Sequence, residues 1–299
     1  GGGLATQQWT VDAYLLTLSA LILFAGSVSD AFGRVLVLRI GLIGFGVASI
    51  AVGLAPDPLT LIIARAVQGA AGAFLVPSSL ALITSQITGP GQSKAIGQWT
   101  AWTTTATLAG PLLGGVFVDT LSWRYAFLVN VVPIAITFVL LARLRIDDHR
   151  RPDAHIDLLS AALSVLGLAG IVFALIEQPN YGWASPLIWI PLIAGIVMFT
   201  AFLLRQRTVA SPILPLGMFT VRNFWTGNLS TFFVYAALSL NGFVVGVYLQ
   251  QGAGLSATLA GLAGLPGTVL LIALSSWIGG LSARFGPRLF MTVGPLLMA

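Results

Sequence analysis

The chain has 299 residues, of which 57% are hydrophobic and only 8% are charged, and its mean hydropathy is +0.95. Soluble domains carry about 25% charged residues, so a soluble fold is excluded and the lipid bilayer must surround most of the chain. The apolar runs are continuous rather than alternating, which favours transmembrane helices over a membrane β-barrel. The chain has no cysteine, and both histidines lie in one polar segment, so we expect no disulfide and no metal site.

Charged residues divide the chain into apolar segments that match the roughly 17 to 25 residues needed to cross a bilayer. We predict membrane-spanning helices at 10–29, 40–56, 59–80, 97–118, 125–142, 158–176, 186–204, 224–249 and 256–278, with a truncated tenth from about 289. Polar and glycine residues at 250–254 predict a turn. The proline-broken segment 211–223 is too short to span, and we expect it along the membrane surface.

The basic residues predict the topology. When the segment after the first predicted helix is placed in the cytoplasm, every basic residue except Arg65 and Arg124 falls on a cytoplasmic segment or loop, which is twelve of fourteen. Cytoplasmic loops carry this excess of positive charge, so the bias supports a multi-pass protein of the cell membrane. It also argues against a nucleic-acid partner, because the positive charge is spread along the membrane surface.

A short charged motif occurs twice, as GSVSDAFGR at 26–34 and as GGLSARFGPR at 279–288. The corresponding positions are Gly26, Gly33 and Arg34 in the first copy and Gly279, Gly286 and Arg288 in the second. Each copy follows a helix that enters the cytoplasm, so we interpret the repeat as a sign of two similar helix bundles. Asp30 occurs only in the first copy, where we expect it to pair with a nearby arginine and to form part of a cytoplasmic gate. The alternative is an ordinary helix hairpin.

Two charged residues at membrane depth are candidates for proton and substrate coupling, because each such charge costs about 2.5–3.5 kcal/mol. Arg65 either extends to the outer interface or faces a cavity, where it would tune a nearby carboxylate. Asp12 is either an ordinary acid at the start of a helix or a carboxylate at the outer mouth of the cavity, where a lipophilic cation competes with a proton. We interpret a third charged candidate, Glu177, as a loop residue.

The segment TATLAGPLLGGVF, at 105–117, holds no charge. Ala106, Gly110 and Gly114 are spaced four apart and predict a small-residue ridge for close helix packing, while Pro111 is expected to bend the helix. The ridge either serves packing alone or lies between two halves of the protein and decides which side of the membrane opens.

These motifs resemble those of the major facilitator superfamily, and in particular its fourteen-helix drug:proton antiporter branch. GSVSDAFGR is similar to the signature of the loop between helices 2 and 3. ARAVQGAAGA, at 64–73, and AGPLLGG, at 109–115, resemble the helix 4 signature and the antiporter signature of helix 5. The matching residues are Arg65, Gln68 and Gly69 for helix 4 and Gly110, Pro111, Gly114 and Gly115 for helix 5.

The resemblance implies the major facilitator fold, with two pseudo-symmetric helix bundles and two extra helices between them. The chain would run from helix 2 to the start of helix 11. Residues 1–142 would form the N-terminal bundle without its first helix. Residues 143–222 would hold a cytoplasmic loop, the two extra helices and an interfacial connector, and residues 223–299 would begin the C-terminal bundle.

The resemblance also implies a function, which is export of drugs or secondary metabolites by proton antiport with alternating access. Such a protein is not an enzyme, needs no cofactor besides the proton gradient, and is expected to act as a monomer on small lipophilic substrates, cations among them. The alternative is a facilitator or proton symporter of the same fold that imports a small nutrient or anion.

Overall fold

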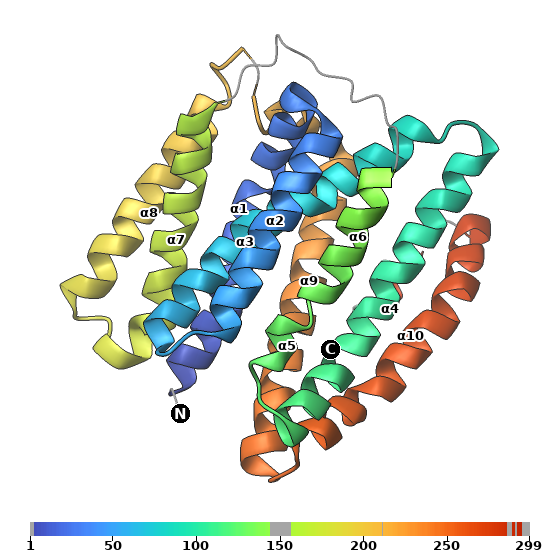
Figure 1. Cartoon of the computed structure of the whole chain (residues 1–299). Coiled ribbons are helices and arrows are strands. Elements are labelled where there is room, and N and C mark those ends of the chain that lie inside the picture. Colours follow the sequence, from blue (N-terminus) through green and yellow to red (C-terminus); the bar gives the residue numbers. More distant parts are fainter. Residues whose placement is uncertain (1–2, 144–156, 211, 286–288, 291, 295–299) are drawn as a thin grey trace. The chain divides into compact units, whose positions relative to one another are not determined.

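The structure is a computed structural model that describes residues 3–143, 157–210, 212–285, 289–290 and 292–294 (Figure 1). All regular structure in these residues is helical, which confirms the predicted fold class. The helices are α1 (Leu4–Phe32), α2 (Arg34–Gly53), α3 (Pro58–Gln86), α4 (Pro90–Thr120), α5 (Tyr125–Leu128), α6 (Val131–Arg143), α7 (Leu158–Tyr181), α8 (Pro186–Arg205), α9 (Arg222–Val247) and α10 (Ala257–Phe285), with a 3₁₀ turn η1 (Leu216–Thr220) and a π-helical turn η2 (Tyr248–Gly252).

Seven helical segments of the described chain are long and apolar enough to cross a membrane. They coincide with seven of the nine complete helices that we predict. Of the other two predicted spans, 97–118 lies within α4, and 256–278 lies within α10 except for its first residue. Helix α4 has 31 residues, which is ample to cross a bilayer, but Gln, Thr and Gly residues make it less apolar than the seven.

The predicted helix at 125–142 differs from the structure, because a turn at Val129 and Asn130 divides it into α5 and α6. The cause is Pro133, which has no N–H to donate to the carbonyl group of Val129. That carbonyl instead accepts a hydrogen bond of 3.2 Å from the N–H of Val132, only three residues ahead. The turn breaks the helix beside α2 and leaves the Asn130 amide free to reach that helix.

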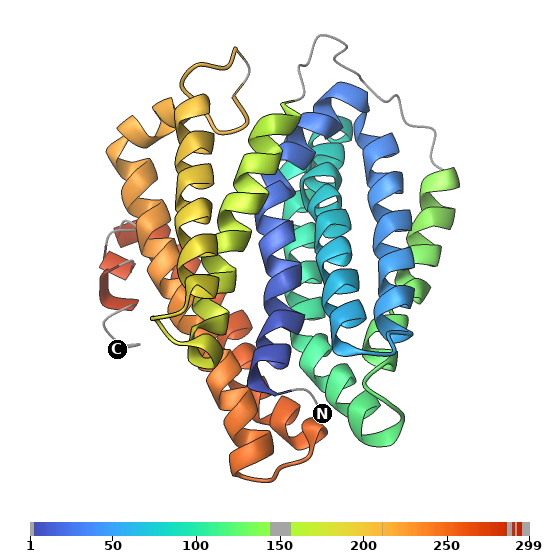
Figure 2. The same ribbon diagram turned by 90° about the vertical axis from the view of Figure 1, so that its left-hand side faces the viewer.

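The chain divides into two compact units, one from Gly1–Gly97 and Phe127–Leu216, the other from Gln98–Ala126 and Gly217–Ala299. In the first unit α3 packs along both α1 and α2, and α7 packs along α8. Figure 2 shows α7 beside α1, and the two helices are in contact. The second unit contains most of α4 together with α9, η2 and α10. The predicted turn at 250–254 lies later than expected, because residues 250–252 belong to η2 and the chain turns at Ala253 and Gly254, where Gly254 has a φ of +67°.

Gly33 joins α1 to α2 in the first charged motif, and its φ of 105° lies where residues with a side chain are strained. We therefore expect Gly33→Ala to lower the free energy of unfolding by about 1–3 kcal/mol. The measurement is thermal unfolding of the purified full-length protein. Gly26→Ala is the matched control, because Gly26 lacks a positive φ and has no atom within 4 Å of an added Cβ. Equal shifts in both variants would contradict the prediction.

Candidate functional site

Arg65 lies in α3, and its side chain is held by neutral groups on three sides. Its Nε donates a hydrogen bond of 2.8 Å to the carbonyl of Thr10 in α1, and its Nη1 donates to Oε1 of Gln68. The guanidinium carbon stands 4.3 Å from the ring centre of Tyr14 and 5.4 Å from that of Phe127. Among the described residues no carboxylate contacts Arg65, so the expected nearby carboxylate is absent from this part of the chain.

A buried polar chain continues from Arg65 into the first unit. The Gln68 side chain is almost fully buried, and its Nε2 donates a hydrogen bond of 2.7 Å to Oγ of Ser49 in α2, which is fully buried. The same Oγ accepts from Nδ2 of Asn130, at 3.4 Å, in the turn after α5. Buried polar groups are stable only when their hydrogen bonds are satisfied. This series of hydrogen bonds therefore holds α2, α3 and the start of α6 in one arrangement.

Asp12 lies on the face of α1 opposite to Arg65. The residues of α1 that meet α3 include Thr10, Tyr14 and Thr17, whose Oγ1 donates to the carbonyl of Ala66 at 2.7 Å. Asp12 is two residues, or about 200° around the helix, from both Thr10 and Tyr14. It lines a groove of about 380 Å³ between α1 and α7. The structure therefore does not bring the two predicted coupling residues together.

The first charged motif forms the turn between the end of α1 and the start of α2, and side-chain contacts hold this turn in place. Nη2 of Arg34 lies 3.4 Å from Oδ1 of Asp30, which is the pairing expected from the sequence. Nη1 of Arg34 donates to the carbonyl of Ala81 in α3 at 2.9 Å. This loop is thus fastened to α3 through one arginine. In the second motif, Gly279 lies in α10, whereas Gly286 and Arg288 lie outside the described residues.

The helix 5 signature lines a cavity of about 750 Å³ within the second unit, between α4, α9, η2 and α10. Its wall includes Pro111, Gly114 and Gly115 of α4, and the amide side chains of Asn241 and Gln250 supply polar groups. The remaining wall is mainly glycine, alanine, valine and leucine. Such a cavity is suited to a small apolar molecule that carries a hydrogen-bonding group.

The close approach of α4 to α10 differs from the predicted ridge. A Cβ at Gly115 would lie 2.6 Å from the carbonyl oxygen of Ala257, and one at Gly261 would lie 2.7 Å from that of Pro111. No described atom lies within 4 Å of a Cβ at Gly110 or Gly114. The packed face therefore contains Pro111 and Gly115, which are four residues apart and lie on one side of the helix.

Asp119 extends this contact at the end of α4. Its two carboxylate oxygens accept hydrogen bonds from the backbone N–H groups of Ala257, at 3.0 Å, and Thr258, at 2.7 Å. These are N–H groups at the start of α10 that have no acceptor inside the helix. A carboxylate at a helix N-terminus is stabilising, so Asp119 serves as a cap for α10 supplied by another helix.

We expect Gly115→Ala to lower the free energy of unfolding by about 1–3 kcal/mol, because the added methyl group would meet the backbone of α10. Gly110→Ala is the control within the same signature, and it is expected to change stability by less than about 0.5 kcal/mol. Thermal unfolding of the full-length protein compares the two. A larger loss for Gly110→Ala would mean that the packed face is the one predicted from the sequence.

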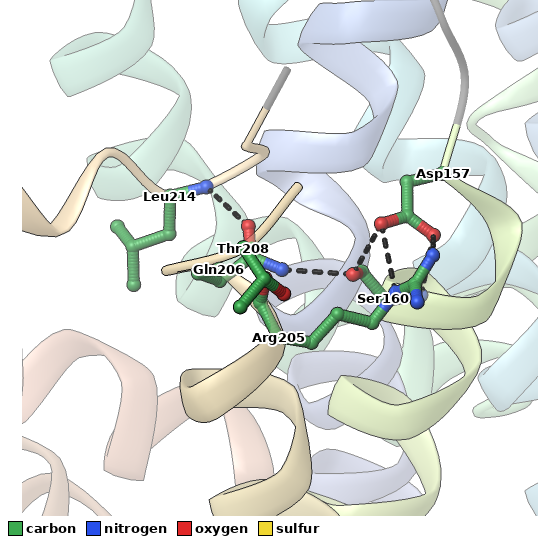
Figure 3. Close-up of polar contacts among 6 residues, drawn as sticks. All are labelled: Asp157, Ser160, Arg205, Gln206, Thr208 and Leu214. Atoms are coloured by element: carbon green, nitrogen blue, oxygen red, sulfur yellow. Dashed lines mark hydrogen bonds and ion pairs between the residues drawn. The ribbon is translucent and has the colours of Figure 1, made fainter. Parts of the chain in front are cut away.

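A second polar network ties α7, α8 and the connector after α8 (Figure 3). Nε and Nη2 of Arg205 each lie 3.1 Å from the Asp157 carboxylate, which also accepts from the backbone N–H and Oγ of Ser160. Gln206 donates to Oγ of Ser160 at 2.8 Å and accepts from the N–H of Leu214 at 3.1 Å. The network fixes the ends of both helices and the start of the connector.

Asp157 gives this network a dependence on pH. Partial burial would raise its pKa, but hydrogen bonds from Arg205 and Ser160 and the charge of Arg205 outweigh burial and lower the pKa to about 2. A lowered pKa in the folded state stabilises the fold above the normal value of 3.8, and this contribution is lost as the pH falls from about 4 towards 2. After allowance for solvent screening we expect about 1 kcal/mol. Unfolding of wild type and Asp157→Asn between pH 7 and 2 measures it, and an equal acid dependence in both would contradict it.

Several partners in these sites escape sequence reasoning. Ser49 and Asn130 carry the only available signal, which is a polar side chain inside or next to an apolar segment. Glu177 is not a loop residue but lies in the last turns of α7, where its Oε1 accepts a hydrogen bond of 2.7 Å from Nε1 of Trp9. Its correct assignment requires knowledge that α7 packs against α1.

The chain matches the Major Facilitator Superfamily over residues 1–299. It is 37% identical to a puromycin resistance protein of Streptomyces alboniger over 98% of this chain and 58% of that protein. It is 32% identical to a tetracenomycin C resistance and export protein of Streptomyces glaucescens, over 99% and 55%, and 34% identical to a multidrug efflux pump of Mycolicibacterium smegmatis, over 98% and 58%. The chain thus spans somewhat more than half the length of these relatives. It belongs to the major facilitator superfamily and is a multi-pass membrane protein.

Proposed function

We propose that the protein containing this chain exports small lipophilic drugs or secondary metabolites across the cell membrane by proton antiport. The observation that carries the proposal is the alignment of nearly the whole chain with proteins named for antibiotic resistance, antibiotic export and multidrug efflux. Alternating access about a central site converts the proton gradient into export, and the substrate leaves chemically unchanged, without a cofactor or an enzymatic step. A monomer is sufficient for this mechanism.

Arg65 and Asp12 are the proposed coupling residues. Arg65 of α3 contacts one face of α1, and Asp12 lies on the opposite face of that helix. Arg65 bonds to the Thr10 carbonyl, two residues before Asp12, so a change in its partners reaches Asp12 through the α1 backbone. A guanidinium held by carbonyl, amide and ring groups keeps its attraction for a carboxylate or a substrate acceptor. Gln68 and Gly69, the other residues of this signature, are proposed to hold Arg65 in position and to keep α1 close to α3.

The remaining signatures are proposed to control opening. The hairpin with Gly26, Asp30, Gly33 and Arg34 would act as the cytoplasmic gate, together with its second copy at 279–288. For the outer ends of α4 and α10 to move apart, two interactions would have to break. These are the close contact of Gly115 with the α10 backbone and the hydrogen bonds from the start of α10 to Asp119. The division into an N-terminal bundle (1–142), an inserted pair of helices (143–222) and a second bundle (223–299) belongs to the same proposal.

Everted membrane vesicles that contain the full-length protein test the proposed function. After the vesicles are energised, a pH-sensitive dye reports proton movement while ethidium or a neutral antibiotic is added. We expect proton release from the vesicle lumen on addition of a transported compound, and none in vesicles without the protein. Absence of proton movement with every compound, combined with downhill uptake of a nutrient or anion, would overturn antiport in favour of a facilitator.

A further inference from the structure

The hydrogen bonds that lead from Arg65 to Ser49 have a fixed direction. A guanidinium can only donate, so Nη1 of Arg65 requires Oε1 of Gln68 on its side, and Nε2 of Gln68 must then face Ser49. If the Gln68 amide were turned over, its NH₂ group would face the guanidinium, which places a donor against a donor. The acceptor that completes the observed orientation is Oγ of Ser49, 2.7 Å from Nε2 of Gln68.

Burial makes Gln68 dependent on this acceptor. Gln68 is 1% exposed and Ser49 is 0% exposed, so bulk water does not reach the hydrogen bond between them. A buried donor that loses its acceptor bears the full cost of desolvation. Without Oγ of Ser49, the Gln68 amide would stay unsatisfied or rotate towards another partner, and its Oε1 would no longer be held towards Arg65.

The turn between α5 and α6 contacts both ends of this series of hydrogen bonds. The ring of Phe127 lies 5.4 Å from the guanidinium carbon of Arg65, and Nδ2 of Asn130 donates to Oγ of Ser49 at 3.4 Å. The N–H of Asn130 donates to the carbonyl of Phe127 at 3.2 Å, so one turn of the backbone fixes the two side chains relative to each other. The helix break beside Pro133 therefore places one group at Arg65 and one at Ser49.

Helix α2 supports the arginine in a second way. Phe45 and Ser49 are four residues apart and lie on one face of α2. The Phe45 ring packs edge-on against the ring of Tyr14, with 6.5 Å between the ring centres, and the Tyr14 ring lies 4.3 Å from the guanidinium carbon of Arg65. The same face of α2 thus holds both the ring beside the guanidinium and the amide that accepts from it.

We propose that Ser49 and Asn130 are positioning residues for Arg65, and that they act through Gln68 to set the direction of the guanidinium. This role rests on the proposed function, in which Arg65 couples proton movement to export. Ser49 makes the larger contribution, because its hydrogen bond to Gln68 is shorter than the one it accepts from Asn130. Helix α2 and the turn between α5 and α6 thereby take part in coupling.

The test compares Ser49→Ala in two backgrounds of the full-length protein, wild type and Gln68→Leu. In wild type, drug-driven proton movement per folded transporter is expected to fall about tenfold. In Gln68→Leu, where no amide remains for Ser49 to hold, Ser49→Ala is expected to cause a further fall of less than about twofold, because apolar groups then replace both partners. Asn130→Ala is expected to act in the same direction as Ser49→Ala but by a smaller factor.

Ser78→Ala is the matched control. Ser78 is also 0% exposed, and its Oγ donates a hydrogen bond of 3.1 Å to Oγ of Ser29. It follows Arg65 by thirteen residues, or about 20 Å, along α3. We expect it to lower thermal stability about as much as Ser49→Ala while leaving proton movement per folded transporter unchanged.

Equal falls for Ser49→Ala in the two backgrounds, or an equal fall for Ser78→Ala in wild type, would overturn the inference, because Ser49 would then only support the fold. Thermal unfolding separates this result from failure of the proposed function. If no compound moves protons in wild type, antiport is wrong, and the stability lost in Ser49→Ala decides the positioning role. A smaller loss in Arg65→Met than in wild type would keep the link between Ser49 and Arg65, and equal losses would overturn it.

Discussion

Gly69→Ala is expected to disrupt the first unit more severely than any other single methyl addition considered. A Cβ at Gly69 would collide with the carbonyl oxygen and carbon of Tyr14 and with Oγ1 of Thr17. None of these atoms can move alone, because two belong to the α1 backbone and the third donates a hydrogen bond to Ala66. Helix α1 would have to separate from α3. We expect a loss of about 3 kcal/mol or more in the free energy of unfolding.

The measurement is the thermal midpoint and the yield of full-length protein extracted from membranes. Gly26→Ala provides the control, since it adds the same methyl group to α1 where no atom lies within 4 Å. Separation of α1 from α3 would also break the hydrogen bond from Arg65 to Thr10, so transport should fall with stability. A Gly69→Ala protein as stable as the control would show that α1 and α3 are farther apart than the structure places them.

The positions of the helices can be predicted from the sequence because each one requires a long apolar segment between charges, and that signal is local. The break at Val129 and Asn130 is harder to predict, because Pro133 is tolerated in the first turn of a helix and also breaks one. The chain turn that follows η2 has a local cause in Gly252 and Gly254, although it begins at Ala253 rather than at the predicted residue 250. Most of the fold within each unit therefore follows from the lengths of the apolar segments and from the charged, glycine and proline residues that separate them.

The candidate sites follow less directly, because they depend on which helix faces which. Arg65, Gln68 and Gly69 can be selected from a motif, but their partners Ser49 and Thr10 belong to two other helices. The prediction that Arg65 tunes a nearby carboxylate assumes a neighbour that the described residues do not supply. The helix 5 ridge shows the same difficulty, since several small residues compete and only the packing of α10 selects Gly115.

Arg65→Met is expected to reduce drug-driven proton movement by at least about tenfold, while the protein remains folded. Methionine keeps much of the volume and the apolar contact with Tyr14 and Phe127, but it cannot donate to Thr10 or Gln68. Loss of a charged donor in a buried network costs about 1.5–3 kcal/mol per hydrogen bond. If this loss falls on the transport cycle, the rate decreases by the corresponding factor.

Arg65→Lys separates the charge from the geometry. Lysine restores the positive charge but lacks the planar, forked set of N–H donors with which the guanidinium reaches Thr10 and Gln68, so we expect only partial recovery. Thermal unfolding of both variants shows whether the protein is intact. A further variant, Gln68→Glu, offers Arg65 a carboxylate and tests whether a fixed ion pair also slows the transport cycle. Full transport by Arg65→Met would show that the arginine only reaches for the outer interface. If Arg65→Met is intact but inactive and Arg65→Lys is partly active, transport needs a positive charge at this depth. The remaining deficit of Arg65→Lys would then measure the contribution of the two hydrogen bonds that orient the guanidinium.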